Sequence, residues 1–289
     1  MSGDDEPAVG TEIDGFRLDA FLHRGGMADL WRTSRVGPAP DGEPPLVLKR
    51  PRVRAGDEPA GIVDYEDESM ILPMLSGPHV PAFVAKGDFT RQPYLVMECI
   101  PGESLRARLA DAPLPPEEVA DTGRRIAIAL HELHRQHVVH LDLKPSNVMF
   151  RPDGRAVLVD FGLSRHDHLP DLLDEELTVP VGTGPYMSPE QLQFVRKDPR
   201  SDLFALGVLL YFLATGERPF GAPTTVRGLR RRLYVDPTPP RALVPTLPPW
   251  LQEVILRCLS VNPDDRHQTA AQLAQDLGDP TQVALTERA

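Results

Sequence analysis

The 289-residue sequence has few cysteines, no long hydrophobic run and a deficit of positive charge. Its two cysteines, Cys99 and Cys258, cannot build a disulfide framework, which excludes a small disulfide-stapled scaffold. The longest apolar run, residues 203–214, is too short to span a bilayer and is typical of a buried helix. Residues 1–14 lack the basic and apolar regions of a secretory signal. We therefore expect a cytoplasmic protein with no membrane segment in this chain.

The charge balance narrows the class of partner. Lysine and arginine number 31 against 42 aspartates and glutamates, which gives a formal net charge of −11. Such an acidic chain does not carry a general surface for nucleic acid or anionic membranes. Apolar residues (41%) and charged residues (25%) are near ordinary globular values, so a packed core is expected rather than disorder.

The hydrophobic pattern changes near residue 99 and predicts two lobes. Residues 1–12 are polar and acidic and are predicted to form a mobile tail. From 13 to 98, short apolar runs bounded by glycine and proline predict strands, interrupted by one helix at 64–75. Residues 99–279 show helical periodicity, and 280–289 form a C-terminal tail. The helices are predicted at 115–134, 201–214, 224–233, 249–259 and 269–277. A ligand is expected between the lobes.

One constellation carries chemistry. His140-Leu-Asp-Leu-Lys-Pro-Ser-Asn147 is followed thirteen residues later by Asp160-Phe-Gly162, with the strand-like run 156–159 between them. These residues resemble the catalytic loop and metal-binding triplet of protein kinases, and the spacing is most similar to bacterial relatives of eukaryotic serine/threonine kinases. The resemblance implies an α+β, two-lobed fold with a small, mainly antiparallel β lobe carrying one main helix, and a larger, mainly α lobe. It also implies ATP-dependent phosphotransfer to serine or threonine hydroxyls of protein substrates.

The resemblance assigns the catalytic residues. Phosphoryl transfer needs positioning and charge neutralisation more than covalent chemistry. Asp142 then accepts or orients the proton of the substrate hydroxyl, and Lys144 contacts the transferring phosphate. Asn147 and Asp160 supply the oxygen ligands that magnesium prefers, with manganese as an alternative ion.

The same resemblance places the nucleotide. Lys49 matches the strand lysine that contacts the α- and β-phosphates, and Glu68 is its best-matching helix partner, with Glu66 as the alternative. Pro73 is expected to kink that helix or end it early. In the loop that covers the phosphates, non-glycine residues at positions 23 and 28 predict a stiffer loop than the family's pattern. The predicted cofactor-binding set is Leu22, His23, Gly25, Gly26, Met27, Leu30, Lys49, Met97, Glu98, Ile100, Asn147 and Asp160.

Downstream residues resemble substrate-docking and supporting elements. Gly182 and Thr183 match the docking loop, and Thr183 falls where serine/threonine kinases place a threonine near the catalytic aspartate. Ser188-Pro-Glu190 resembles the motif that closes the activation segment. The predicted structural residues are His140, Phe161, Gly162, Glu190, Asp202 and Arg266.

The chain departs from the family at Leu141, where many kinases have an arginine that binds a phosphate on the activation loop. A leucine removes that charge partner, so we hypothesise that activity does not require phosphorylation of the loop. Acidic residues already populate the segment. Thr178 and Thr183 are its candidate phosphorylation sites.

Three other features have alternative interpretations. Four histidines at 131, 134, 137 and 140 suggest a metal site, but a helix end that leads into the catalytic loop explains them better. His137 occupies a position where members of the resembled family often have glycine, and the sequence does not explain the histidine there. Cys99 is expected to be a small, partly buried hydrophobe rather than a reactive thiol. A basic patch either is a solvated face or docks an acidic partner. It consists of Arg227, Arg230, Arg231 and Arg232.

Two other functions compete with an active protein kinase. The first is a pseudokinase, a nucleotide-binding or scaffold module, which the altered glycine loop and Leu141 would suit. The pseudokinase interpretation is disfavoured because the catalytic and nucleotide-binding positions are retained, namely Lys49, Asp142, Asn147 and Asp160. The second is a small-molecule phosphotransferase of the same fold, which the peptide-docking elements at 182–190 disfavour.

Overall fold

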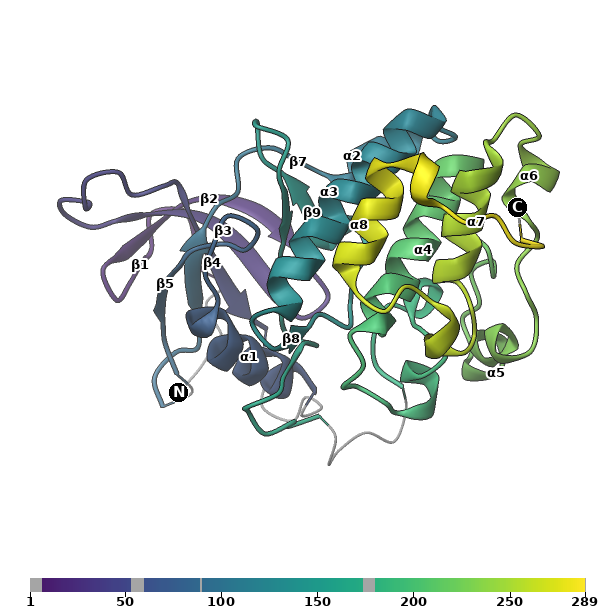
Figure 1. Cartoon of the computed structure of the whole chain (residues 1–289). Helices are drawn as coiled ribbons and strands as arrows, with labels where there is room; N and C mark the ends of the chain where they lie inside the picture. Colours follow the sequence, from purple (N-terminus) through teal and green to yellow (C-terminus); the bar gives the residue numbers. More distant parts are fainter. Residues whose placement is uncertain (1–6, 53–59, 89, 174–179, 289) are drawn as a thin grey trace.

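The computed structural model describes residues 7–52, 60–88, 90–173 and 180–288 (Figure 1). The N-terminal part is a six-stranded sheet in the order β1-β2-β3-β4-β6-β5, and every neighbouring pair is antiparallel. One helix, α1 (Ala60–Ile71), accompanies it. The strands are β1 (Glu12–Ile13), β2 (Phe16–Arg24), β3 (Ala28–Arg35), β4 (Leu46–Pro51), β5 (Phe83–Lys86) and β6 (Leu95–Glu98). The predicted β lobe with one main helix is confirmed.

Alternation along β4 explains how the sheet presents a lysine to the cleft. Leu46 and Leu48 are buried in a cluster with Phe16, Trp31 and Val96 on one face of the sheet. Since successive side chains of a strand point to opposite faces, Val47 and Lys49 point the other way. Both line the cleft between the lobes.

Helix α1 ends where the sequence predicted a break. The helix stops at Ile71, and Pro73 lies in the 3-10 turn Leu72–Met74 that follows it. Proline lacks a backbone N–H and cannot continue the hydrogen-bond ladder. The helix is therefore shorter at its C-terminal end than the predicted range of 64–75, and it begins earlier, at Ala60.

The larger lobe is built around α4 (Arg200–Thr215), almost every residue of which is buried. Helices α3 (Pro116–His134) and α7 (Pro249–Cys258) pack on α4, and α8 (Ala270–Gly278) runs beside α3 (Figure 1). Four of the five predicted helices are confirmed. The fifth, 224–233, splits into α5 (Val226–Leu229) and a 3-10 turn, Arg230–Leu233. The remaining short helices are α2 (Leu105–Arg108) and α6 (Pro240–Leu243).

Two small sheets bring the chemical motifs together. Strands β7 (Glu103–Ser104), β9 (Val148–Phe150) and β10 (Ala156–Leu158) form one, and β8 (Val138–Val139) pairs with β11 (Arg165–His166) in the other. The segment 140–147 connects β8 to β9, and 159–164 connects β10 to β11. Because β8 pairs with β11 and β9 with β10, the two segments lie side by side.

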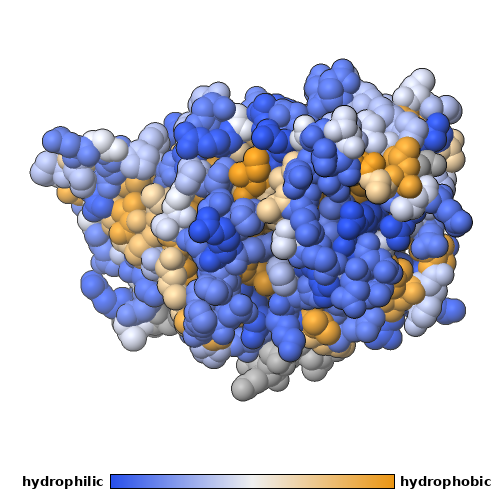
Figure 2. Space-filling view, viewed as in Figure 1, coloured by the Kyte–Doolittle hydropathy of each residue, from blue (hydrophilic) through white to orange (hydrophobic). Residues whose placement is uncertain are grey.

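Both ends of the described chain pack against the lobes. The Gly10 amide donates to the Leu18 carbonyl at 2.8 Å and Glu12 lies in β1, so ordered structure begins inside the segment predicted as a tail. Near the other end, the Thr286 hydroxyl donates to the buried carboxylate of Glu253 at 2.9 Å. No helix in the described ranges is long and apolar enough to cross a membrane. The face seen in Figure 2 is mainly hydrophilic, with apolar residues in small separate groups.

Candidate active site

The loop carrying Asp142 is braced from beneath by Asp202, the third residue of α4. The Asp202 carboxylate accepts hydrogen bonds from the backbone amides of His140 and Leu141, both at 2.9 Å. His134 Nε2 lies 2.8 Å from Oδ2, the oxygen that also accepts the His140 amide. Burial opposes the charged form, yet these hydrogen bonds and charges hold the pKa of Asp202 below its ordinary value. The brace fixes a strained turn, since Leu141 has a φ of 62°.

Three side chains converge on the Asp142 carboxylate, two from its own loop (Lys144 and Asn147) and one, Thr183, from 41 residues further along the chain. One oxygen accepts the Thr183 hydroxyl at 2.7 Å and the Thr183 amide at 3.0 Å. The other oxygen accepts Lys144 Nζ at 2.5 Å and Asn147 Nδ2 at 3.2 Å. The carboxylate thus has a fixed orientation and a cation beside it, which suits a group that must hold a substrate hydroxyl.

Lys49 joins three elements through its ammonium group. Its Nζ lies 2.5 Å from Glu68 of α1 and 2.6 Å from Asp160. Burial opposes the charged ammonium, but Asp160 and Glu68 outweigh it and raise the pKa of Lys49. Lys49 in turn lowers the pKa of Asp160. The structure places Glu68, and not Glu66, against Lys49.

A cleft of about 600 Å³ between the lobes gathers the predicted nucleotide-binding residues. Every member of the predicted cofactor-binding set lines it, together with Asp142, Lys144, Gly182 and Thr183. Sequence reasoning missed Asp64, which also lines the cleft. Burial and the nearby Asp160 carboxylate raise the pKa of Asp64 to about 7. Its position one helical turn before Glu68 could have revealed it, because residues four apart share a helix face.

The loop between β2 and β3 is clasped by arginines. Arg52 donates to the carbonyl oxygens of Gly25 and Gly26, both at 2.5 Å, and Arg24 pairs with Asp29 at 3.1 Å. A Cβ at Gly25 would lie 3.1 Å from a backbone oxygen, so the tight approach falls on this glycine. This clasp supports the prediction of a stiff loop, although the sequence did not show the part that Arg52 plays.

The strand β6 and the residues after it form the back of the cleft. Met97 is buried, and the Glu98 carboxylate is held by both guanidinium nitrogens of Arg151, which ties this segment to the β9–β10 hairpin. Burial raises the pKa of the Cys99 thiol and so disfavours the reactive thiolate. Cys99 therefore fits the prediction of a partly buried hydrophobe.

The docking loop is fastened to the helical lobe by an ion pair and a buried arginine. Arg266 binds Glu190 through two nitrogens at 2.6 and 2.8 Å. Arg232, predicted to belong to an exposed basic patch, is instead fully buried. It donates to the carbonyls of Gly184, Pro185, Met187 and Leu229. Burial lowers its pKa to about 10. The prediction that Arg232 belongs to the exposed basic patch is therefore wrong. The other three arginines of the patch are exposed, namely Arg227, Arg230 and Arg231.

Replacing Arg232 with methionine is expected to destabilise the protein by about 3 kcal/mol, because each buried carbonyl oxygen left without a donor costs about 1–3 kcal/mol. Denaturant unfolding measures this. The matched control is Arg231→Met, whose exposed side chain predicts a change within about 0.5 kcal/mol. Equal stability of the two variants would contradict the anchoring part given to Arg232.

The histidines do not gather as a metal site: among the described residues, no cluster of three or more histidine, cysteine or acidic side chains is arranged to hold an ion. His140 supports the catalytic loop, with Nε2 3.2 Å from the Val159 carbonyl oxygen and Nδ1 accepting the Asp142 amide at 3.3 Å. His137 has a φ of 61°, a left-handed conformation that glycine adopts without strain. That geometry explains why glycine suits the position better.

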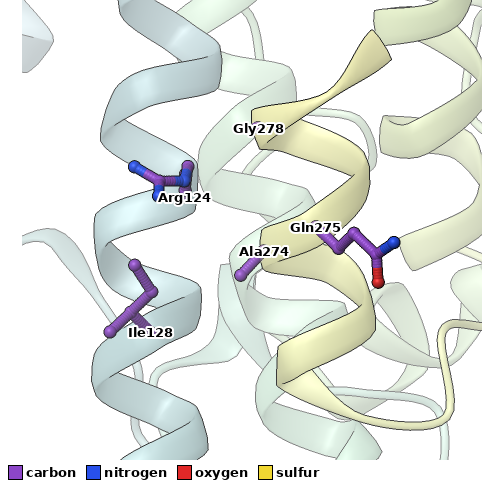
Figure 3. A pocket seen from close by; sticks show the side chains of 5 residues that line it. All are labelled: Arg124, Ile128, Ala274, Gln275 and Gly278. Carbon is purple, nitrogen blue, oxygen red and sulfur yellow. The ribbon is translucent and has the colours of Figure 1, made fainter. Parts of the chain in front are cut away.

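A second hollow of about 390 Å³ lies between α3 and α8 (Figure 3). Arg124 and Ile128 line it from α3, and Ala274, Gln275 and Gly278 line it from α8. One charged group and one amide give this hollow no set of groups for phosphoryl transfer. The chemistry of the chain is therefore concentrated in the cleft between the lobes.

The comparison with protein families agrees with this geometry. A family model described as the protein kinase domain matches residues 49–277. The chain belongs to the protein kinase family. It is 32% identical to serine/threonine-protein kinase PknL of Mycobacterium bovis, a bacterial relative, over 279 residues, which cover 96% of this chain and 68% of that protein.

Further relatives and a solved structure fit the same family. A protein of Corynebacterium glutamicum named "Probable serine/threonine-protein kinase PknB" is 29% identical over 285 residues. The match covers 96% of this chain, which spans only 44% of that relative's length. The crystal structure of the kinase domain of Mycobacterium tuberculosis PknI superposes with a TM-score of 0.69 at 23% identity, covering 94% of this chain and 98% of the other. The predicted two-lobed kinase fold is confirmed, and the chain is a protein kinase domain of the bacterial serine/threonine type.

Proposed function

We propose that this kinase domain is catalytically active and transfers the γ-phosphoryl group of ATP to serine or threonine hydroxyls of proteins. The observation that carries the proposal is the Asp142 carboxylate, which lies in the cleft and is held by Thr183, Lys144 and Asn147. In the reaction, the substrate hydroxyl oxygen forms a bond to the γ-phosphorus while the bond to the β–γ bridging oxygen breaks. Asp142 takes up the hydroxyl proton, and ADP leaves with the bridging oxygen.

The neighbours of Asp142 supply the charge and the position. Lys144 stands beside the carboxylate and is placed to neutralise charge on the moving phosphoryl group. We assign Lys49, which is paired with Glu68 and lines the cleft, to the α- and β-phosphates. These residues form the fixed electrostatic environment that phosphoryl transfer requires.

The donor set fits a divalent cation of the magnesium class. The Asp160 side chain is 41% exposed, and Asp160 and Asn147 both line the cleft. The amide oxygen of Asn147 accepts the Ser146 hydroxyl at 3.1 Å. Such oxygen donors are those that magnesium prefers. When bound, a divalent ion neutralises the charge of the ATP phosphates. Lys144 and Asn147 hold Asp142 in place on their own, so the orientation of the proposed base is built into the chain.

The lobes divide the work. We assign residues 13–98 to nucleotide binding and 99–279 to catalysis and substrate binding, and we assign neither task to 1–12 or 280–289. The peptide-docking assignment rests on Gly182 and Thr183, which line the cleft beside Asp142. It disfavours a small-molecule phosphotransferase, which has no need of a docking loop.

The direct test of substrate class is phosphopeptide mapping of a generic protein substrate after incubation with ATP and magnesium. We expect phosphate on serine and threonine only, and none when EDTA removes the divalent ion. Phosphate on tyrosine, or transfer that survives EDTA, would contradict the proposal.

We further propose that this kinase does not depend on phosphorylation of its activation segment, because Leu141 supplies no cation to bind a phosphate there. Thr178 lies outside the described residues. Thr178→Ala is expected to keep kcat within about twofold of the wild type. Loss of activity in a variant with unchanged thermal stability would overturn this independence.

A further inference from the structure

The segment that follows Asp160-Phe-Gly162 is held by arginines from outside the catalytic loop. Arg196 Nε lies 3.0 and 3.2 Å from the two carboxylate oxygens of Asp171, and its Nη2 donates to the Leu163 carbonyl at 3.2 Å. Arg165 Nε approaches the same carboxylate at 3.4 Å. The Arg196 side chain is only 5% exposed. One buried guanidinium therefore grips the segment at two points, next to the metal-binding triplet and eight residues further on.

Asp67 of α1 is a buried carboxylate on which the charge of Arg196 acts. Asp67 is 3% exposed, and its Oδ2 has no hydrogen-bond partner among the described residues. Burial raises the pKa of Asp67 to about 7, and Arg196 is the charge that opposes this rise most. Asp67 adjoins Glu68, the partner of Lys49. The charge of Arg196 therefore favours the ionised form of a carboxylate that lies next to the partner of Lys49.

The backbone that carries Arg196 is tied to the ion pair between Glu190 and Arg266. Arg196 follows Glu190 by six residues, and the Val195 amide donates to the Glu190 carbonyl at 2.9 Å. Glu190 is itself fixed by Arg266. Leu141 is buried and apolar, and its carbonyl accepts the Gln191 side chain at 2.8 Å, so the loop's own residue at that position contributes no cation.

We propose that Arg196 is the positioning residue that holds the segment 163–173 in the arrangement required for phosphoryl transfer, with the Asp171 carboxylate as the built-in partner of its guanidinium. The inference rests on the proposed kinase activity. A carboxylate built into the chain makes the required contact without a phosphate, so it also accounts for independence from loop phosphorylation. Arg196 acts through Asp171 and Leu163 and is not among the residues that line the cleft.

The test compares Arg196→Met with the wild type, with Arg196→Lys and with a control, Arg200→Met, whose guanidinium pairs with Asp198 and Asp264 instead. Arg196→Met is expected to lower kcat by about 10- to 100-fold, the loss typical of a misplaced catalytic group. KM for ATP should stay near the wild-type value while KM for a peptide rises. Arg196→Lys should recover part of kcat, and Arg200→Met should resemble the wild type.

A second variant separates positioning from stability. In Arg196→Met the Asp171 carboxylate loses its buried cation, so the protein should be less stable. Adding Asp171→Asn removes the stranded charge and is expected to restore part of the melting temperature without restoring kcat. Recovery of kcat together with the melting temperature would overturn the proposal. If Arg196→Met does not fold, Asp171→Asn provides the same comparison, because it removes the segment's charge and leaves the arginine in place.

Hydrogen exchange makes the inference independent of activity. The amides of residues 163–173 should exchange faster in Arg196→Met and in Asp171→Asn than in the wild type or Arg200→Met. Unchanged exchange and unchanged kcat in both variants would contradict the part given to Arg196. If neither the wild type nor any variant transfers phosphate but hydrogen exchange rises as expected, the proposed function fails. The positioning of the segment 163–173 by Arg196 is then still supported.

Discussion

Replacing Asp142 with asparagine is expected to lower kcat by about 10²–10⁴-fold, the usual contribution of a positioned general base. Asparagine keeps the shape and can still accept the Thr183 hydroxyl, but it cannot take up the substrate proton and leaves Lys144 without its partner at 2.5 Å. Steady-state transfer to a peptide measures the loss. Stabilisation by ATP in a thermal melt should remain close to the wild type, because Asp142 lies at the substrate end of the cleft.

The control for this variant is Asp153→Asn. Asp153 pairs with Arg155 in an exposed hairpin turn away from the cleft, so its kcat should be unchanged. An Asp142→Asn enzyme with kcat within a factor of about two of the wild type would remove Asp142 from the reaction.

Replacing Lys49 with methionine is expected to lower both activity and stability. The ammonium is paired at once with Glu68, which is 1% exposed, and with Asp160. Its removal leaves a buried carboxylate uncompensated, and breaking a buried pair in this way typically costs about 3–5 kcal/mol. The kcat/KM for ATP should fall because the phosphates lose their cation, and chemical denaturation should show the stability loss.

The double variant Lys49→Met with Glu68→Gln distinguishes the two effects. Glutamine removes the buried charge, so we expect the free energy of unfolding to recover in part while activity stays low. A single Lys49→Met variant as stable as the wild type would show that the pair with Glu68 carries little of the stability of the fold.

Local patterns in the sequence predicted most of the fold. Strand alternation, the proline at 73 and helical periodicity each depend on neighbouring residues, and the structure follows them in α1, α3, α4, α7 and α8. The kinase motifs also have fixed local spacing, so residues such as Asp142 and Asn147 could be identified before any geometry was known.

The parts that sequence could not predict depend on contacts between distant residues. Arg232 looks like its exposed neighbours in the sequence, and only the fold brings it under the carbonyls of 184–187. Arg196 and Asp171 are 25 residues apart, and Arg151 and Glu98 are 53 apart. A charged side chain is usually solvated, so its burial and its partner become visible only when the chain is folded.

Phosphotransfer that depends on Asp142 is tested most directly by intact mass. The purified protein and a generic protein substrate are weighed after incubation with ATP and magnesium, beside the same experiment with Asp142→Asn. We expect mass increments of one or more phosphates on either protein with the wild type and none with the variant. No phosphate on either protein, together with clear thermal stabilisation of the wild type by ATP, would contradict this expectation and show a nucleotide-binding module without phosphotransfer.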